Sequence, residues 1–235
     1  METSQNRKPL GSLKTPAPVI KALAAQLGHP SGWRGRLVGR MLNRRNRGII
    51  RAAVNALEAA PDARLADIGF GGGVGIQLLL ERVGPDGHVD AVDQSETMVD
   101  AAHRRFRDDL TAGRLSLFEA SMERLPQADA SLDGVITLNT FYFLPDLGRA
   151  AAEFARVLRP GGRLVVGVFD PAAMQRMPVV EHGFRVRPTE EITAALESAG
   201  LIQTRHLRVG HGPDAYHLLL VSPALPPASE STEAA

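Results

Sequence analysis

The sequence predicts an α/β fold, a doubly wound parallel sheet that ends in an antiparallel hairpin. Short apolar runs alternate with helical patterns from about residue 65 onward, which is the order of strands and helices in such sheets. A glycine-rich turn behind an aspartate follows the first run, in "LADIGFGGGVG" at 65–75. The last two runs are separated only by "GHGPDA" at 210–215, which is too short for a parallel crossover.

The predicted strands are short apolar segments that glycine, aspartate or proline mostly bound. They lie at 65–69, 88–93, 114–119, 132–139, 163–169, 201–209 and 216–221. Apolar residues at helical spacing predict helices between them, at 95–110, 147–158 and 189–199. The last of these opens with Thr189, and Glu190 and Glu191 follow in its first turn, as is typical of a helix start. The same spacing predicts one or two helices over 34–58.

Composition favours one domain of the larger kind, because 44% of the 235 residues are apolar. The absence of cysteine excludes disulfides, cysteine-ligated zinc and iron–sulfur sites. The sequence has no apolar run long enough to span a bilayer, and its first twenty residues contain no apolar core of a secretory signal. We therefore expect a cytoplasmic protein.

Charge is distributed unevenly along the chain. Residues 1–57 hold 11 Lys and Arg against one acid, Glu2, whereas the remainder has a balance of −9. Such a division predicts a separate task for the amino-terminal part. We expect a disordered tail over 1–18, a basic helical segment over 19–58, a main domain over 59–222 and a second disordered tail over 223–235.

The glycines after the first strand predict a sharp turn into a helix and a ligand lying directly against the backbone. The dinucleotide pattern G-x-G-x-x-G fails, because counting from Gly69 reaches Val74 and counting from Gly71 reaches Ile76. The P-loop pattern fails as well, since no Gly-Lys-Ser/Thr follows. The residues present are an acid and alternate glycines, Asp67, Gly69, Gly71 and Gly73.

Asp93 ends the second predicted strand, twenty residues after Gly73. In an open α/β sheet, ligands bind at the carboxyl ends of the strands, so Asp93 faces the same crevice as the glycine turn. Its carboxylate is suited to accept hydrogen bonds from a ribose diol. The alternative is a helix cap, because Gln94, Ser95 and Glu96 begin a helix. The glycine turn upstream favours the ligand interpretation.

Four motifs, in this order and spacing, resemble the class I S-adenosylmethionine-dependent methyltransferases, especially the small-molecule, type 11-like branch. They are "LADIGFGGGVG" (65–75), "VDAVDQSETMVDAA" (89–102), "ASMERLPQADASLDGVITLNTFYFLPD" (120–146) and "EFARVLRPGGRLVVGVF" (153–169). The resemblance runs from about Val54 to about Val221. It implies a Rossmann-like, doubly wound seven-stranded sheet with the last strand antiparallel and an amino-terminal helical cap.

The resemblance also implies the cofactor, S-adenosylmethionine, and the residues that hold it. Gly69, Gly71 and Gly73, with the intervening Phe70, would let the cofactor lie against the backbone. Asp67 would meet its amino-acid end, directly or through water. Asp93 would hold the ribose, and Met98 or Gln94 would cover one adenine face. Ser121 stands where the family often has an acid that contacts the adenine amine, so Ser121 or the Met122 backbone would take that place. Asn139 would lie beneath the sulfonium.

Methyl transfer is an in-line displacement, and we expect it to proceed mainly through proximity and orientation. A general base is needed only if the acceptor must lose a proton. Two weak candidates for one are Tyr142, which a pocket-wall role explains equally well, and His182, more simply a surface histidine in "PVVEHGF". The sequence predicts no metal site.

The basic stretch "GWRGRLVGRMLNRRNRGIIR" at 32–51 allows several functions. It could be a lid over the site, a nucleic-acid surface, a contact for anionic membranes, or an ordinary solvated helix face. We favour the lid, since added amino-terminal helices commonly cap the site in the resembled family. The low aromatic content disfavours nucleic acid. The leading hypothesis is a methyltransferase with a small-molecule acceptor; the alternatives are an RNA methyltransferase and a non-catalytic S-adenosylmethionine-binding protein. A homodimer is one option for the assembly.

Overall fold

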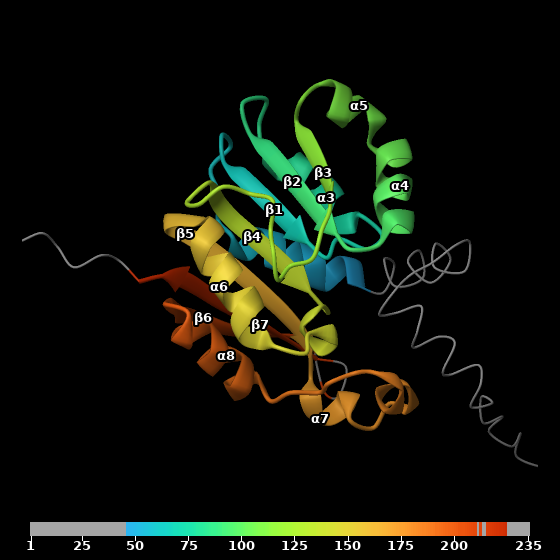
Figure 1. The fold of residues 1–235 in the computed structure, drawn as a ribbon, viewed down its shortest axis with the longest axis vertical. Helices are drawn as coiled ribbons and strands as arrows, with labels where there is room; N and C mark the ends of the chain where they lie inside the picture. Colours follow the sequence, from blue (N-terminus) through green and yellow to red (C-terminus); the bar gives the residue numbers. More distant parts are fainter. Residues whose placement is uncertain (1–45, 211, 213–214, 225–235) are drawn as a thin grey trace, which may run out of the picture.

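The computed structural model describes residues 46–210, 212 and 215–224, and it shows the predicted sheet (Figure 1). Seven strands lie in the order β3-β2-β1-β4-β5-β7-β6. Their bounds are β1 Arg64–Ile68, β2 His88–Asp93, β3 Leu115–Glu119, β4 Leu132–Leu138, β5 Leu158–Phe169, β6 Leu201–Val209 and β7 Tyr216–Pro223. Strand β7 runs antiparallel to both its neighbours, and the other pairs are parallel, which confirms the predicted fold class.

Strand β5 begins five residues earlier than the sequence predicts. Leu158 already pairs with Leu132 of β4, and the ladder resumes where Arg163 pairs with Gly134. The residues between, 159–162, bulge out of the ladder, and Gly161 adopts a φ of 80° that favours glycine. Gly161 and Gly162 therefore lie in an irregularity inside the strand.

The helices flank the sheet in the expected order. They are α3 Val74–Arg82, α4 Glu96–Arg105, α5 Arg107–Thr111, α6 Leu147–Val157, α7 Pro171–Met174 and α8 Thr189–Ser198, with short 3-10 turns η1 Phe141–Phe143 and η2 Pro178–His182. The single helix predicted over 95–110 is wrong in one respect, because it divides into α4 and α5. The break lies at Phe106, where φ is −111° and ψ is 31° and the ring is buried.

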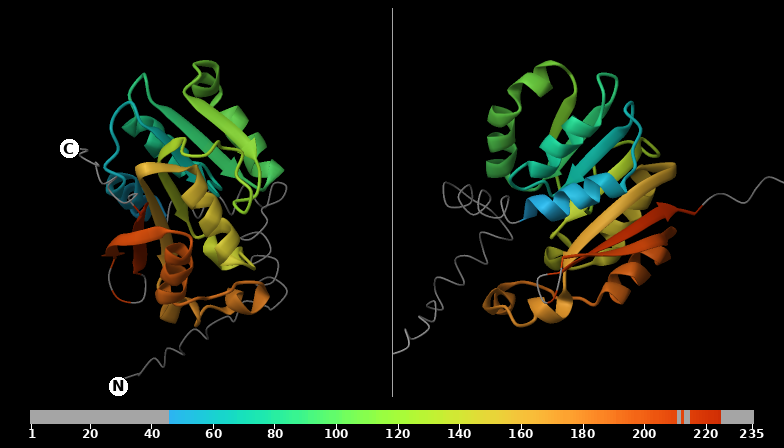
Figure 2. Two further views of the ribbon diagram at one scale, coloured as in Figure 1. Left: turned by 60° about the vertical axis from the view of Figure 1, so that its left-hand side comes forward. Right: turned by 180° about the vertical axis from the view of Figure 1, so that it is seen from behind.

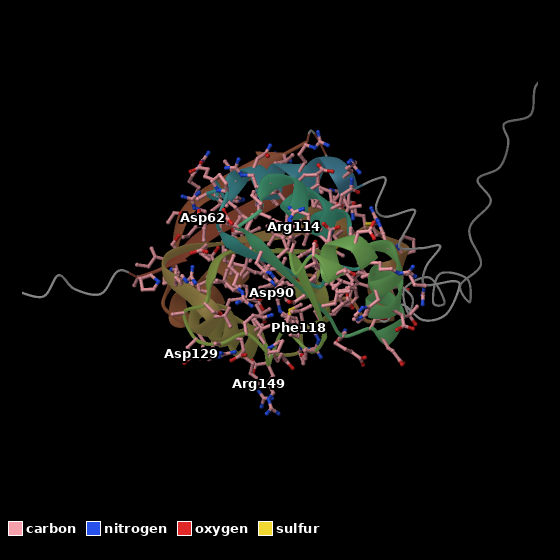
Figure 3. All side chains as sticks on the ribbon, turned by 90° about the horizontal axis from the view of Figure 1, so that it is seen from above. Asp62, Asp90, Arg114, Phe118, Asp129 and Arg149 are labelled. Atoms are coloured by element: carbon pink, nitrogen blue, oxygen red, sulfur yellow. The ribbon has the colours of Figure 1, made fainter. Side chains whose placement is uncertain are left out.

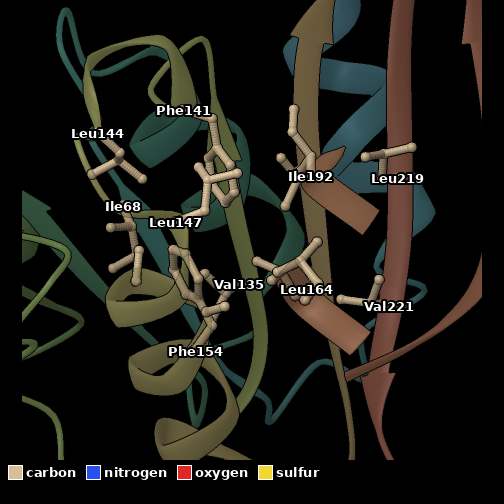
Figure 4. Packing of buried hydrophobic residues seen from close by; sticks show 14 of the residues in the cluster. Ile68, Val135, Phe141, Leu144, Leu147, Phe154, Leu164, Ile192, Leu219 and Val221 are labelled. Atoms are coloured by element: carbon tan, nitrogen blue, oxygen red, sulfur yellow. The ribbon is translucent and has the colours of Figure 1, made fainter. Parts of the chain in front are cut away.

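One face of the sheet is covered by α6 and α8 (Figure 1). The apolar stripe of α6 packs Phe154 against Phe141, with parallel rings whose centroids are 6.2 Å apart. Leu164 of β5 and Ile192 of α8 complete this side of the core, as Figure 4 shows. Burying such side chains is the main favourable contribution to folding.

The opposite face is covered by α3, α4 and a helix over residues 46–56 (Figure 2). Ile49, Ala53 and Leu57 are buried there in one cluster with β-strand residues. The Arg163 guanidinium donates to the carbonyls of Ala56 and Leu57, which satisfies the end of this helix. Residues 46–57 therefore pack against the sheet, and the domain division at residue 58 stays a prediction. The tail predicted over 1–18 and the remainder of the basic segment, 19–45, lie outside the described residues.

The amino-terminal ends of β1 and β2 are joined by an ion pair between a buried aspartate and a partly exposed arginine. Asp90 of β2 is fully buried, and Arg64, the first residue of β1, donates to both of its oxygens at 2.9 to 3.2 Å. In Figure 3 Asp90 lies well within the outline of the molecule, whereas Arg149 projects from it. A buried carboxylate needs such partners to offset its loss of water. This pair locks β1 against β2 at the end opposite the glycine turn.

Candidate functional site

The candidate site lies at the carboxyl ends of β1, β2 and β4. Strand β1 pairs with β2 on one side and with β4 on the other. The chain therefore extends the sheet from β1 in one direction through β2 and β3, and in the opposite direction from β4 onward. Open α/β sheets bind their ligands at such a switch point. The glycine turn after Ile68, Asp93 at the end of β2 and Asn139 after β4 all lie at this edge.

Glycine occupies the three alternate positions for different physical reasons, although each of the three residues adopts a positive φ of 50° to 77°. A Cβ at Gly69 would lie 2.4 Å from the methyl carbon of Thr140, and one at Gly73 would lie 3.0 Å from the Phe106 ring. Packing therefore requires glycine at both positions. A Cβ at Gly71 would have nothing within 4 Å. Gly71 is thus the glycine beside which a ligand has room.

Asp93 ties the end of β2 to this turn. Its Oδ2 accepts a hydrogen bond from the Gly71 amide at 2.8 Å, and its Oδ1 accepts one from the Ser95 amide at 2.9 Å. Ser95 is the N-cap of α4, so Asp93 also shapes the helix start, as the alternative interpretation expected. Each carboxylate oxygen can accept a second hydrogen bond, and a diol supplies two donors. The two interpretations of Asp93 are therefore compatible.

Asp67 points into the first turn of α3. Its Oδ2 lies 2.1 Å from where a Cβ on Gly75 would stand, and the Ile76 amide donates to it. Burial, followed by the charge of Asp93, raises the pKa of Asp67 to about 8. Asp67 is 4% exposed. The geometry thus shows a structural link between β1 and α3, and the contact of Asp67 with the amino-acid end of a cofactor, directly or through water, stays a prediction.

The residues expected around an adenine have unequal positions. Gln94 is exposed, whereas Met98 is buried in the core cluster beneath α4. Ser121 is exposed, and its hydroxyl accepts from the Glu123 amide at 3.2 Å. The methyl of Met122 approaches within 3.8 Å of the Cβ position of Gly69, so this side chain lies next to the turn. Gln94 and Met122 are better placed to cover a ligand than Met98.

Asn139 begins the segment that follows β4. It adopts the left-handed conformation with a φ of 60°, and its amide donates to the Gly167 carbonyl at 2.8 Å. The hydroxyl of Tyr142 lies 3.5 Å from its Oδ1. Non-glycine residues in this region are uncommon and often mark functional sites. Asn139 is therefore held rigidly at the same edge as the glycine turn.

Tyr142 is a buried residue whose hydroxyl already has a partner. The Phe169 amide of β5 donates to that oxygen, and the side chain is 4% exposed. Burial raises the pKa of the Tyr142 hydroxyl well above its usual value. These properties fit a brace between β4 and β5 rather than a proton acceptor. The backbone of His182 ends η2, but its side chain lies outside the described part of the chain.

An aromatic surface adjoins Asn139. The ring centroids of Phe143 and Phe184 lie 4.8 Å apart, and Tyr142 is 6.1 Å from Phe184; both phenylalanines are half-buried. Arg187 fastens the segment of Phe184 to η1, because its guanidinium donates to the carbonyls of Phe141 and Leu144. The cation is occupied by these contacts and by Glu191. This surface therefore offers apolar rings beside the site.

Sequence reasoning missed three residues that shape the glycine turn. They are Thr140, which fills the space at Gly69, Phe106, which lies behind Gly73, and Arg105, whose guanidinium donates to the Gly72 carbonyl. A glycine that makes room for the side chain of a residue distant in the sequence leaves no signal in a single sequence. The only local hint was at Phe106, an aromatic residue that interrupts the polar end of a predicted helix.

The residues present fit S-adenosylmethionine in two respects. The open space at Gly71 admits a ligand against the backbone, and Asp93 presents carboxylate oxygens beside it. Among the described residues, no group of three or more His, Asp or Glu could hold a metal ion. Within the same residues, no helix has both the length and the apolar character needed to cross a membrane.

Comparison with known proteins finds similarity to methyltransferases. Residues 66–166 match the family described as "Methyltransferase domain". The ubiquinone/menaquinone biosynthesis C-methyltransferase of Vibrio parahaemolyticus is 28% identical over 130 residues, which are 55% of this chain and 50% of that protein. The chain spans only a quarter to a half of the length of the curated relatives that it matches.

Solved structures share the fold. A methyltransferase in complex with the Trm112 methyltransferase activator of Haloferax volcanii gives a TM-score of 0.71 at 20% identity, covering 87% of this chain and 98% of that one. A SAM-dependent methyltransferase from Aquifex aeolicus gives a TM-score of 0.64 at 19% identity, covering 90% of this chain and 100% of that one. These structural alignments cover more of the chain than the family match does.

Proposed function

We propose that the protein, whose residues 66–166 match the methyltransferase domain family, is a class I S-adenosylmethionine-dependent methyltransferase of the type 11 branch and that it methylates a small-molecule acceptor. The cofactor follows from the family. The acceptor is the proposed part, and the similarity to the Vibrio C-methyltransferase of ubiquinone/menaquinone biosynthesis supports a small organic acceptor.

The observation that carries the proposal is the juxtaposition of Gly71 and Asp93. Gly71 has open space where a side chain would stand, and its amide is bonded to the Asp93 carboxylate. A ligand that lies against Gly71 thus meets an acceptor for hydroxyl protons at the end of β2. This arrangement suits a nucleoside whose remaining groups need no phosphate cradle.

The chain's own residues would act by binding and orientation. When bound, S-adenosylmethionine supplies an activated methyl group attached to a sulfonium. We propose that Asp93 holds the ribose, that Gly71 allows the close approach, and that Asn139 bounds the side facing the acceptor. Fixing the two reactants in line can supply several kcal/mol of the rate enhancement, so a dedicated base is not required for acceptors that are already nucleophilic.

The acceptor surface is proposed to be the half-buried rings of Phe143 and Phe184. They adjoin Asn139 through Tyr142, and the nearby Arg187 is occupied by backbone carbonyls. Such a surface favours an acceptor with an apolar part over a compact anion. For an acceptor identified in the assay below, Phe184→Ala should raise its KM and leave the cofactor Kd unchanged.

The test is transfer of a radiolabelled methyl group from S-adenosylmethionine to a panel of phenols, quinols, amines, thiols and RNA. Label on one of the small acceptors supports the proposal. Label confined to RNA and abolished by salt would instead identify the RNA methyltransferase. Cofactor binding without transfer to any acceptor would identify a non-catalytic binding protein. Two variants are compared in this assay. Asp93→Ala alters the proposed ribose contact, and Asp100→Ala, an exposed change on α4, is its matched control.

A further inference from the structure

The glycine turn is fastened from outside as well as from inside. Arg105 ends α4, and one nitrogen of its guanidinium donates to the Gly72 carbonyl at 2.9 Å. A second nitrogen donates to Oε1 of Gln77, in the second turn of α3, at 2.7 Å. One side chain therefore joins the turn to the helix that follows it, using the fixed fork of donors that arginine offers.

Phe106 extends this contact beneath the turn. Its ring lies 3.0 Å from the Cβ position of Gly73, the N-cap of α3, and the Arg105 guanidinium carbon is 4.9 Å from the ring centroid. The interruption between α4 and α5 at Phe106 brings both side chains against the glycines. The helix break thus has a structural consequence at the site.

We infer that Arg105 is a positioning residue, which holds the glycine turn in its binding conformation and thereby sets the affinity for the cofactor. The turn contains three glycines with positive φ, and glycine loses more conformational freedom on ordering than any other residue. A turn that is ordered beforehand loses less entropy when a ligand binds. Asp93 fixes the turn through Gly71 on the ligand side, and Arg105 fixes it through Gly72 on the outer side.

The two hydrogen bonds of Arg105 do not involve an opposite charge. Its partners are a carbonyl and an amide oxygen, both neutral, and it stands near the positive end of α3. Burial and the guanidinium of Arg47 hold the pKa of Arg105 below its ordinary value. Geometry, in the form of two directed hydrogen bonds, is what this arginine contributes.

Arg104 provides a matched control. It is the preceding residue of the same helix, and its side chain is 58% exposed, with Asp100 3.9 Å away. Arg104→Met removes the same charge from nearly the same place without removing a contact to the turn. Comparison of Arg105→Met with Arg104→Met therefore separates the contact from the charge. Arg105→Lys keeps the charge but cannot reach both oxygens with the same geometry.

The experiment is calorimetric titration of the full chain and its variants with S-adenosylhomocysteine, together with hydrogen exchange of the peptide that covers 69–77. We expect Arg105→Met to raise Kd five- to tenfold, about 1 to 1.4 kcal/mol, and to speed exchange in this peptide. Arg105→Lys should give an intermediate rise. Arg104→Met should match the wild type in both measurements, and all three variants should keep the wild-type unfolding midpoint within about 2 °C.

An unchanged Kd and exchange rate in Arg105→Met would overturn the inference, as would equal effects of Arg104→Met and Arg105→Met. The inference rests on the cofactor binding assumed in the proposed function, and the two can fail separately. If the wild type does not bind S-adenosylhomocysteine, the proposed function fails, whereas exchange in 69–77 still tests whether Arg105 orders the turn.

Discussion

The carboxylate of Asp93 accepts a hydrogen bond from the backbone amide of Gly71 at 2.8 Å, which joins the end of β2 to the turn after β1. This contact brings together two features that suit such a cofactor, an open backbone and an acceptor for ribose hydroxyls. Asp93 therefore has a structural role, and we propose that it also binds the ribose.

Asp93→Ala should weaken binding of S-adenosylhomocysteine by roughly 1 to 3 kcal/mol, because it removes charge-assisted hydrogen bonds and frees the Gly71 amide. Titration calorimetry measures the change. Asp100→Ala, which alters an exposed aspartate on α4, should bind like the wild type. Equal affinity of Asp93→Ala and the wild type would reduce Asp93 to a residue that shapes the start of α4.

The raised pKa of Asp67 predicts that the stability of the protein depends on pH. Burial and Asp93 raise its pKa from 3.8 to about 8, so between these values the folded state holds a proton that the unfolded state has lost. The stability of the wild type should therefore fall as pH rises from 4 to 8, and this contribution should be constant above 8. In Asp67→Asn the group does not titrate, so the dependence should disappear.

Urea unfolding at pH 5 and pH 8 measures this difference. The stability of Asp67→Asn relative to the wild type should increase by roughly 2 to 4 kcal/mol between the two, since one pKa unit corresponds to about 1.4 kcal/mol. Asp100→Asn, exposed on α4, is the control and should show no such change. A constant difference between Asp67→Asn and the wild type would mean that Asp67 is ionised in the folded protein.

The contact between Gly69 and Thr140 predicts that a second substitution restores part of the stability that the first one removes. Gly69→Ala should cost roughly 2 to 4 kcal/mol of stability, because its Cβ meets the Thr140 methyl at 2.4 Å and its φ of 77° is strained for alanine. Thr140→Ser removes that methyl and keeps the hydroxyl that bonds Thr137 at 2.7 Å. The double variant should regain part of the loss, as denaturant unfolding would show; no recovery would place the whole cost in the backbone.

The variant Tyr142→Phe distinguishes a structural role of the Tyr142 hydroxyl from a role as general base. Loss of the hydroxyl leaves the buried Phe169 amide without this partner, so stability should fall by about 1 to 3 kcal/mol. With an acceptor in hand, kcat and its pH profile should stay close to those of the wild type, since the pKa of Tyr142 is raised away from the working range. A kcat reduced a hundredfold or more, with a lost limb in the pH profile, would make Tyr142 the base.

The sheet could be predicted because its signals are local. Each strand is a short apolar run, and the brief connection at 210–215 dictates the antiparallel hairpin. The division at Phe106 and the early start of β5 could not, since both depend on distant partners: Gly73 receives the Phe106 ring, and Leu132 pairs with Leu158. The helix over 46–56 was expected, but its packing on the sheet depends on Arg163 and buried strand residues.

The site was predictable in part for the same reason. The spacing of Gly71 and Asp93 along successive strands places them at one edge, and the structure joins them. The orientation of Asp67 toward Gly75 and the burial of Met98 depend on which side of each backbone faces α3 or the core, which strand order alone does not specify. The contribution of Arg105 arises from the helix break and was likewise hidden.

The most direct test of the account is calorimetric titration of the wild-type chain with S-adenosylmethionine, S-adenosylhomocysteine and NAD. The open backbone at Gly71 beside Asp93 predicts binding of the first two with a Kd on the order of micromolar, about −8 kcal/mol. NAD should bind at least a hundredfold more weakly, because the turn lacks the dinucleotide spacing. Preference for NAD, or no heat from either S-adenosyl compound, would contradict the account.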